Sequence, residues 1–166
     1  FELIKQGQNI SRTTIAKETK LTPTTVSSLV DELIEGGFVM QVGIGESTTG
    51  RKPILLEVNP AGAQIPVLDF RAKGIAYALF DLRFRVLERA FRPFPKAMLD
   101  ISGSDGEEVV YRRIGEADIV ATAIEILKHD AMQINWEKVR SVCITVPGTF
   151  LWEERSFTSS VLKIKT

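Results

Sequence analysis

The sequence predicts a two-domain chain of mixed α+β and α/β structure, with an N-terminal winged helix-turn-helix ahead of a larger domain. Three observations support this. Residues 10–37 contain two short capped helices joined by a tight turn. A strand pair with a Gly- and Ser-rich tip follows. After residue 60, strand-like runs give way to a helix and a further strand, so the predicted domains are 1–60 and 61–166.

The helices of the first domain are marked by their ends. Residues 1–6 have the composition of the last turns of a helix that stops at Gly7, and since the chain does not begin with Met we expect residues before it. Ser11 is placed to cap the next helix. Thr22 caps the one after it, with Pro23 at the first helical position, where a missing N–H costs nothing. Two consecutive glycines end that helix.

The second capped helix has two contrasting faces. Its apolar side chains, at i, i+3, i+4 and i+7, form a stripe predicted to face a core: Val26, Leu29, Val30 and Leu33. Thr24 and Ser28 point away from the stripe, with Thr25 and Ser27 on its flanks. Small hydroxyl side chains suit close approach to a major groove, where they bond base edges or phosphates. An ordinary capped hairpin rich in Ser and Thr is the alternative, but the caps, the proline and the polar face together favour DNA recognition.

The strand pair completes the predicted winged helix. Residues 38–43 and 54–58 alternate apolar and polar side chains, and residues 44–53 between them form a flexible tip. Arg and Lys at a loop tip are ordinarily only solvated, but next to a recognition helix they would lie along the DNA backbone and minor groove. The predicted DNA-binding residues are Ser11, Arg12, Thr22, Thr24, Thr25, Ser27, Ser28, Gly50, Arg51 and Lys52.

Charge and composition limit the function. The chain carries 21 Lys and Arg against 21 Asp and Glu, and residues 1–60 hold six against seven, a net charge of minus one. Strong nonspecific binding to DNA is therefore not expected, and affinity should come from local contacts doubled through a dimer. No apolar run approaches the roughly 18 residues of a membrane span, and no signal peptide is visible. The single Cys143, expected as a small core residue, fits a reducing cytoplasm.

The second domain is predicted from its hydrophobic pattern. Residues 59–63 read as a linker and 92–106 as a loop. The expected strands are 65–70, 75–82, 85–91 and a buried 139–146 that stops at Pro147-Gly148. Residues 116–129 form the expected helix, whose predicted core stripe is Val120, Ala123, Ile124 and Leu127. His129, near the end of this helix, is interpreted as a residue that suits a helix C-terminus and not as a metal ligand.

Two segments carry a resemblance to a known family. These are the second capped helix, in residues 21–37, and the run Ser-Thr-Thr-Gly-Arg-Lys-Pro-Ile-Leu-Leu-Glu-Val-Asn at 47–59. They resemble repressors of the ROK family (repressor, open reading frame, kinase), of the xylose and N-acetylglucosamine repressor type. The resemblance implies a winged helix joined to part of a sugar-kinase-like domain of the actin and hexokinase class. It also implies a double-stranded DNA operator, a sugar or sugar derivative as effector, and a homodimer or homotetramer.

The departures from the family pattern argue against catalysis. Kinases of this family have a Gly-rich phosphate turn after the first strand of the domain, where residues 69–74 here read Asp-Phe-Arg-Ala-Lys-Gly. One His and one Cys exclude the family's zinc cluster from these residues. We therefore expect no catalytic residues, no metal and no cofactor. Two alternatives remain: an ATP-dependent sugar kinase, and a DNA-binding module whose second domain serves only for assembly.

Overall fold

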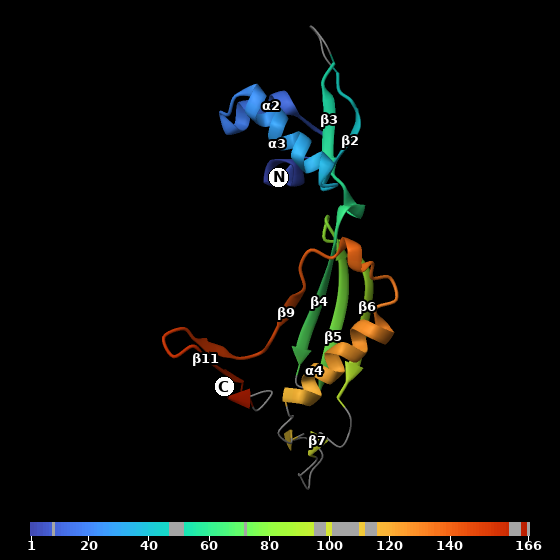
Figure 1. Ribbon diagram of the computed structural model, residues 1–166, viewed down its shortest axis with the longest axis vertical. Coiled ribbons are helices and arrows are strands. Elements are labelled where there is room, and N and C mark those ends of the chain that lie inside the picture. Colours follow the sequence, from blue (N-terminus) through green and yellow to red (C-terminus); the bar gives the residue numbers. More distant parts are fainter. Residues whose placement is uncertain are drawn as a thin grey trace. The chain divides into compact units, whose positions relative to one another are not determined.

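The chain folds into two compact units, each combining helices and strands (Figure 1). The computed structural model describes residues 1–7, 9–46, 52–71, 73–94, 99–100, 110–111, 116–159 and 164–165. Unit 1 comprises Phe1–Gln64 with Phe80–Arg85, and unit 2 comprises Ile65–Leu79 with Val86–Thr166. Within the described ranges, none of the helices has the length and apolar character that crossing a membrane requires.

The helices of unit 1 begin and end where their capping residues predict. Helix α1 spans Glu2–Gln6, α2 spans Arg12–Thr19 and α3 spans Pro23–Glu35. The Ser11 side chain accepts a hydrogen bond from the backbone N–H of Thr14, and Thr22 accepts one from the N–H of Thr25. Both predicted caps are confirmed, as is the position of proline in the first turn of α3.

A three-stranded antiparallel sheet packs with these helices. Its order is β1-β3-β2, with β1 at Ile10–Ser11, β2 at Val39–Ile44 and β3 at Ile54–Val58. The predicted hairpin of β2 and β3 is confirmed. Strand β1 was not predicted, since two residues carry no alternating pattern that a sequence reading can detect.

The core of unit 1 joins all three helices to the hairpin. Its buried members are Ile4, Ile15, Val26, Val30, Val39, Leu56 and Val58. Leu29 was predicted in the core stripe of α3, but 46% of its surface is exposed. The stripe is narrower than predicted because Val26 and Val30 are buried at i and i+4, with Leu33 and Ile34 partly buried beyond them.

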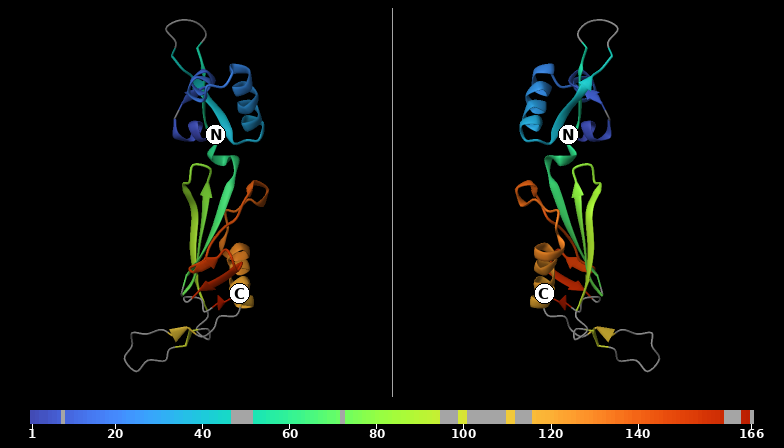
Figure 2. Two further views of the ribbon diagram at one scale, coloured as in Figure 1. Left: turned by 90° about the vertical axis from the view of Figure 1, so that its left-hand side faces the viewer. Right: turned by 90° about the vertical axis from the view of Figure 1, so that its right-hand side faces the viewer.

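Unit 2 is built on a four-stranded sheet. Strands β4 (Gln64–Arg71), β5 (Gly74–Asp81) and β6 (Val86–Pro93) form the predicted meander, and β9 (Cys143–Thr145) pairs in parallel with β4. Helix α4 (Glu116–Glu125) lies on one face of this sheet (Figure 2). Between them lies a core that includes Leu68, Phe70, Ile75, Tyr77, Leu79, Ile119 and Ile126.

The predicted helix is present, but only half of its predicted core stripe faces the core, since Ala123 and Leu127 pack against it. Val120 and Ile124 are 56% and 44% exposed, whereas Ile119, Thr122 and Ile126 are buried. Ile119, Thr122, Ala123 and Ile126 also follow the i, i+3, i+4, i+7 spacing, with a threonine in one position. The last turn, Ile126–Asp130, is a π-helix rather than an α-helix, and His129 lies in it with an exposed side chain.

The predicted buried strand at 139–146 is also corrected. Only Cys143–Thr145 form a strand, and the predicted range is preceded by a 3-10 turn at Trp136–Lys138. Cys143 is exposed, so its prediction as a core residue is wrong. Among the residues that the structure describes, only β4 pairs with this strand, and Ile144 is 57% exposed. The expected loop at 92–106 contains strand β7 (Leu99–Asp100), which pairs with β8 (Val110–Tyr111).

The last described residues form a separate small sheet. Strands β10 (Thr149–Leu151), β11 (Ser156–Ser159) and β12 (Ile164–Lys165) pair antiparallel in chain order. The Ser159 hydroxyl donates to the backbone oxygen of Pro147 at 2.5 Å, which fixes β11 to the turn that follows β9. No elements were predicted for this segment.

Because Tyr77 is buried, the free energy of unfolding of unit 2 should fall at alkaline pH. Burial and the neighbouring Glu88 carboxylate raise the pKa of the phenol to about 12. The pKa of this phenol in the unfolded chain is about 10. Because its pKa is higher in the folded protein, the contribution of the neutral phenol to stability is complete below about pH 10 and is lost as the pH rises toward 12. At pH 11 the wild-type free energy of unfolding should fall by about 1 kcal/mol relative to Tyr77→Phe, measured by urea titration of both proteins from pH 8 to 11. Parallel pH profiles of the two proteins would contradict this.

Candidate nucleic-acid interface

The first half of α3 presents hydroxyl groups to solvent. Thr24, Thr25 and Ser28 are exposed and Ser27 is half-buried, while Val26 and Val30 turn into the core. This arrangement follows from the helical period, because positions 24 and 28 lie on the face opposite the apolar stripe. The first two turns of the helix therefore offer small hydrogen-bonding groups to solvent, together with the partly exposed Leu29.

The N-terminus of α3 is stabilised by a pair of threonines. The Thr22 hydroxyl accepts from the N–H of Thr25 at 3.2 Å and lies 2.8 Å from the Thr25 hydroxyl. These two predicted site residues therefore share a local hydrogen bond that fixes the first turn of the helix. Thr24 and Ser28 are the exposed hydroxyls that remain for a ligand on this face.

Arg12 connects α2 to α3. One guanidinium nitrogen donates to the Asp31 carboxylate at 2.6 Å and the other to the backbone oxygen of Ser27 at 3.1 Å. The bond from Arg12 lowers the pKa of the Asp31 carboxyl. The guanidinium is therefore engaged within the protein, although about a quarter of the Arg12 side chain stays exposed.

Ser11 is buried, and its hydroxyl lies near two threonines. Besides accepting from the N–H of Thr14 at 3.1 Å, the oxygen lies 2.7 Å from the Thr13 hydroxyl and 2.9 Å from that of Thr14. The predicted site residue at this position thus acts as a helix cap. Thr13 itself is exposed and was missed by the sequence reading, although its place in the first turn after a capping residue was a usable signal.

A cavity of about 390 Å³ lies between the start of α2 and the loop end of the β2–β3 hairpin. It is lined by Ser11, Arg12, Thr13, Glu46, Lys52, Pro53 and Ile54. The structure therefore brings Lys52, which is exposed, near the start of α2, 40 residues away in sequence. The predicted site residues Gly50 and Arg51 lie outside the described residues.

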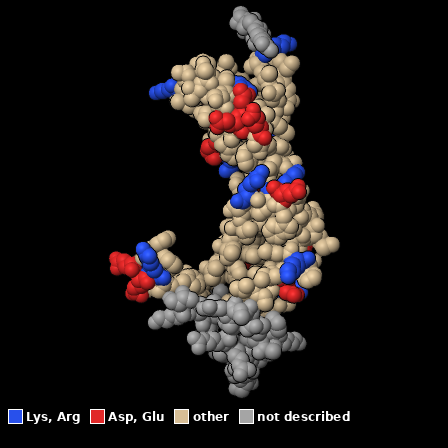
Figure 3. All heavy atoms as spheres, viewed as in Figure 1, with Lys and Arg blue, Asp and Glu red and all other residues tan. Residues whose placement is uncertain are grey.

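Charge on unit 1 is not strongly positive. In the face drawn in Figure 3, acidic side chains gather over the helices of unit 1. Asp31, Glu32 and Glu35 are exposed on α3, all in its second half. A DNA backbone could therefore approach the start of α3 more readily than its end, because carboxylates repel phosphate.

Unit 2 has a carboxylate at the end of its parallel strand pair. Asp69 on β4 accepts from the Thr145 hydroxyl at 2.5 Å and from Arg71 at 2.7 Å, and these bonds lower the pKa of its carboxyl. Both oxygens of Asp69 are thus engaged by neighbouring side chains. The described residues contain no group of three His, Cys, Asp or Glu side chains placed to hold a metal ion.

Known proteins similar in sequence are transcriptional regulators by name. The chain is 38% identical over 110 residues to a xylose repressor of Caldicellulosiruptor bescii, covering 66% of this chain and 26% of that protein. It is 47% identical over 82 residues to a xylose repressor of Staphylococcus xylosus, covering 47% and 21%. Against the dual regulator NagC of Escherichia coli K12 it is 30% identical over 96 residues, covering 58% and 24%. The chain thus spans about a quarter of the length of these curated relatives.

The fold also occurs in a solved structure. A ROK family transcriptional regulator described as a homologue of the E. coli MLC protein matches with a TM-score of 0.63 and 23% identity, covering 95% of this chain and 36% of that one. No family model matches the chain. The resemblance to ROK-type xylose and N-acetylglucosamine repressors, predicted from the sequence, is confirmed by these relatives.

Proposed function

We propose that this chain, related to ROK-type repressors, is the DNA-binding part of a transcriptional repressor of sugar metabolism. Residues 1–60 are its winged helix-turn-helix domain, and residues 61–166 are part of a sugar-kinase-like domain for effector binding and assembly. The observation that carries the proposal is the exposed hydroxyl face at the start of α3, opposite its buried stripe. The relatives' names, which are those of repressors, support the regulatory role and not catalysis.

Docking by the start of α3 fits the charges of the helix. In helix-turn-helix proteins the N-terminal residues of the recognition helix contact base edges. Thr24 and Ser28 would read bases, while Thr25 and Ser27 lie on the flanks and Thr22 orders the first turn. Asp31 would stay outside the groove, together with the other acidic side chains of the second half.

The residues around α2 take supporting roles in this proposal. Thr13 and Lys52, which line the same cavity, would contact phosphates on one strand, and Arg12 would hold α2 against α3 in the geometry that both helices need. Ser11 would act through its cap of α2. Glu46 also lines the cavity, so phosphate contacts there should be few, and a homodimer or homotetramer would supply affinity by binding two half-sites. The effector would be a sugar or sugar derivative and the working compartment the cytoplasm.

Two neighbouring residues of the proposed wing, Arg51 and Lys52, should contribute differently to DNA binding, one to sequence preference and the other to general affinity. We expect Arg51→Ala to relax a preference for A·T pairs at the flanks of each half-site, because narrow A-tract minor grooves attract arginine. Lys52→Ala should instead weaken binding to all DNA sequences alike. It should also lower the slope of log affinity against log salt concentration by about one. A selection from duplexes with randomised flanks, combined with salt titrations, measures both. An unchanged flank preference in the Arg51 variant would remove the wing from sequence readout.

Selection from a randomised duplex library tests the proposal directly. The 166-residue chain should enrich an inverted repeat, and the enriched duplex should compete better than a scrambled duplex of the same composition by at least about 100-fold. Enrichment of no sequence would contradict sequence-specific binding. Calorimetry with a panel of sugars and ATP on the whole protein then separates the roles: a sugar response without ATP turnover supports the repressor, and turnover of ATP would contradict it.

A further inference from the structure

The turn between β5 and β6 is fixed by a buried carboxylate. Asp81 is 2% exposed and accepts three hydrogen bonds, from the N–H of Arg83 at 2.8 Å, the N–H of Arg85 at 3.0 Å and the Nε of Arg85 at 2.7 Å. Within the turn, Phe84 adopts a left-handed backbone with φ of 58°, which is uncommon for a bulky residue. A turn held this firmly presents its side chains in set directions.

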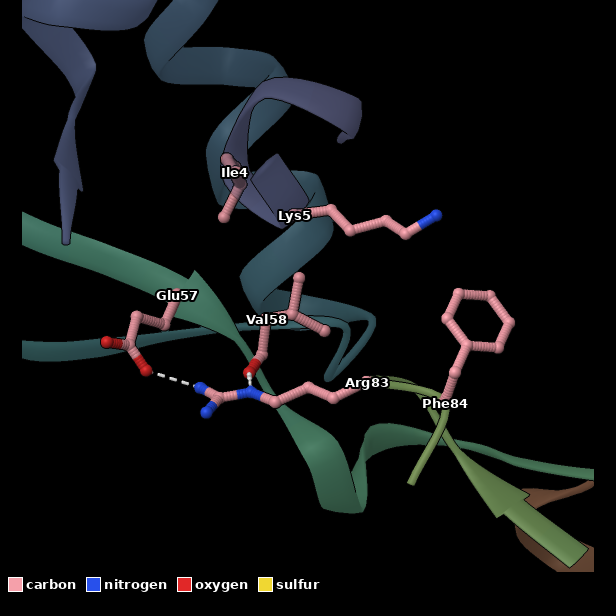
Figure 4. Close-up of a pocket in the computed structure, with 6 residues that line it drawn as sticks. All are labelled: Ile4, Lys5, Glu57, Val58, Arg83 and Phe84. Atoms are coloured by element: carbon pink, nitrogen blue, oxygen red, sulfur yellow. Dashed lines mark hydrogen bonds and ion pairs between the residues drawn. The ribbon is translucent and has the colours of Figure 1, made fainter. Parts of the chain in front are cut away.

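Those side chains belong to unit 1, which includes Phe80–Arg85. Arg83 donates through Nε to the backbone oxygen of Val58 at 3.0 Å and forms an ion pair with Glu57 (Figure 4). Leu82 packs against the core of unit 1, and its N–H donates to the oxygen of Pro60 at 3.4 Å. The turn therefore holds the end of β3 through a side chain, a backbone bond and an apolar contact.

The same turn reaches the first helix. The Lys5 ammonium lies 4.7 Å from the centre of the Phe84 ring, a cation–π contact. A cavity of about 260 Å³ is lined by Ile4, Lys5, Glu57, Val58, Arg83 and Phe84, so the end of α1 and the end of β3 face each other across it (Figure 4). These contacts join the turn to two elements of unit 1 that the sequence places far from it.

The end of β3 is in turn joined to the end of α3. The backbone N–H of Asn59 donates to the oxygen of Phe38 at 2.9 Å, and its side-chain amide donates to the oxygen of Gly37 at 2.8 Å. Gly62 approaches the oxygen of Gly37 so closely that an added Cβ would lie 2.1 Å from it. Residues 37–38 follow the C-cap Gly36 of α3, and the N–H of Phe38 bonds to the oxygen of Leu33 within the helix. A short chain of bonds therefore leads from Arg83 to the base of α3.

We infer that the turn Asp81–Arg85 is a positioning element of the DNA interface, with Arg83 setting the orientation of α3 through the end of β3. The inference rests on the proposed function. It adds a residue that lies 23 positions beyond the predicted end of the DNA-binding domain at residue 60. Arg83 acts only through Glu57 and Val58, so it should affect discrimination among sequences more than general affinity for DNA.

The test measures two affinities of the full 166-residue chain. The probes are the duplex enriched by the wild-type chain from a randomised library and a scrambled duplex of equal length. Arg83→Ala should weaken binding to the enriched duplex by about 10-fold and binding to the scrambled duplex by less than about two-fold, since phosphate contacts do not depend on the exact angle of α3. Arg83→Lys keeps the charge beside Glu57 but not both bonds, so it should recover part of the loss. Arg89→Ala, an exposed arginine of β6, is the matched control.

Two results would overturn the inference. One is an Arg83→Ala affinity for the enriched duplex within two-fold of wild type, and the other is an equal loss on both duplexes. If Arg83→Ala does not fold, Glu57→Gln carries the same test, because it keeps the side-chain volume and removes only the charge of the ion pair. About three-fold weaker binding to the enriched duplex alone is then expected, and no change would overturn the inference.

Amide hydrogen exchange separates failure of the inference from failure of the proposed function. The N–H groups of Asn59 and Phe38, which lie on the path to α3, should exchange about 10-fold faster in Arg83→Ala and unchanged in Arg89→Ala. If the wild-type chain enriches no duplex, the proposed function fails, while faster exchange still shows that Arg83 holds the base of α3. Unchanged exchange in a chain that does bind its enriched duplex would overturn the inference alone.

Discussion

Replacing Asp81 with Ala should lower the free energy of unfolding by about 2 to 4 kcal/mol, the largest stability effect that we expect from a single polar residue of unit 1. The carboxylate is 2% exposed and accepts from the N–H groups of Arg83 and Arg85 as well as from the Arg85 side chain. Alanine leaves these donors without an acceptor inside a tight turn, and each orphaned donor costs roughly 1 to 3 kcal/mol. Urea titration followed by circular dichroism measures the change.

Asp81→Asn is the matched variant, because it keeps one acceptor oxygen and loses the charge. It should cost about half as much as the alanine. Burial alone raises the pKa of the Asp81 carboxyl, but hydrogen bonds from Arg85 and Arg83 outweigh it and lower that pKa. A lowered pKa means that this stabilisation is complete above the unfolded value of about 4 and is lost as pH falls through the folded value. The gap between wild type and Asp81→Asn should therefore narrow below pH 4, and an alanine variant as stable as wild type would contradict both statements.

Local signals account for the parts of unit 1 that the sequence predicted. Ser11 and Thr22 each cap a helix by bonding an N–H three residues later, and Pro23 needs only the position beside a cap. Such interactions are complete within four residues. A sequence reading therefore identifies them without knowledge of the rest of the fold.

The core face of α4 could not be predicted in the same way. Two faces of the helix have side chains at i, i+3, i+4 and i+7, one starting at Val120 and the other at Ile119. The face that starts at Val120 has four apolar residues and is the more exposed. The structure buries the other, which includes Thr122, and its Ile119 and Ile126 join the core of unit 2.

Burial of β9 was likewise not a local property. The apolar run around Cys143 reads as a buried parallel strand, but burial depends on what covers the sheet edge. Among the described residues only β4 pairs with it, and Ile144 and Val146 stay exposed. The same pattern of residues is thus compatible with a buried and an exposed strand.

The candidate site also combines features that follow from local sequence with features that depend on tertiary packing. The hydroxyl face of α3 follows from helical period alone, and its exposed residues are where the sequence placed them. The partners of the charged residues do not follow from any period. Arg12 bonds Asp31, 19 residues away, and Arg83 bonds Glu57, 26 residues away, because tertiary packing brings these side chains together. Arg12 was therefore predicted to touch DNA, and its bond to α3 could not be foreseen.

Replacing Thr24 and Ser28 together with Ala should weaken binding to the enriched duplex by about 2 to 6 kcal/mol, since each lost base contact costs about 1 to 3 kcal/mol. Both side chains are exposed on the face of α3 opposite Val26 and Val30. No described bond within the protein depends on either hydroxyl, so their loss should act on the ligand and not on the fold. Fluorescence anisotropy with the enriched and scrambled duplexes measures the change, which should be large on the first and small on the second.

The change in the free energy of unfolding distinguishes a loss of DNA contacts from destabilisation of the fold. Ala has a higher helix propensity than Thr or Ser, so the double variant should be as stable as wild type or more so, by up to roughly 1 kcal/mol. Weaker sequence-specific binding by a more stable protein can only come from lost contacts. Thr158→Ala removes an exposed hydroxyl from β11 and is the control that should leave both affinities unchanged. An unaltered affinity and an unaltered sequence preference in the Thr24 and Ser28 variant would mean that another surface reads the operator.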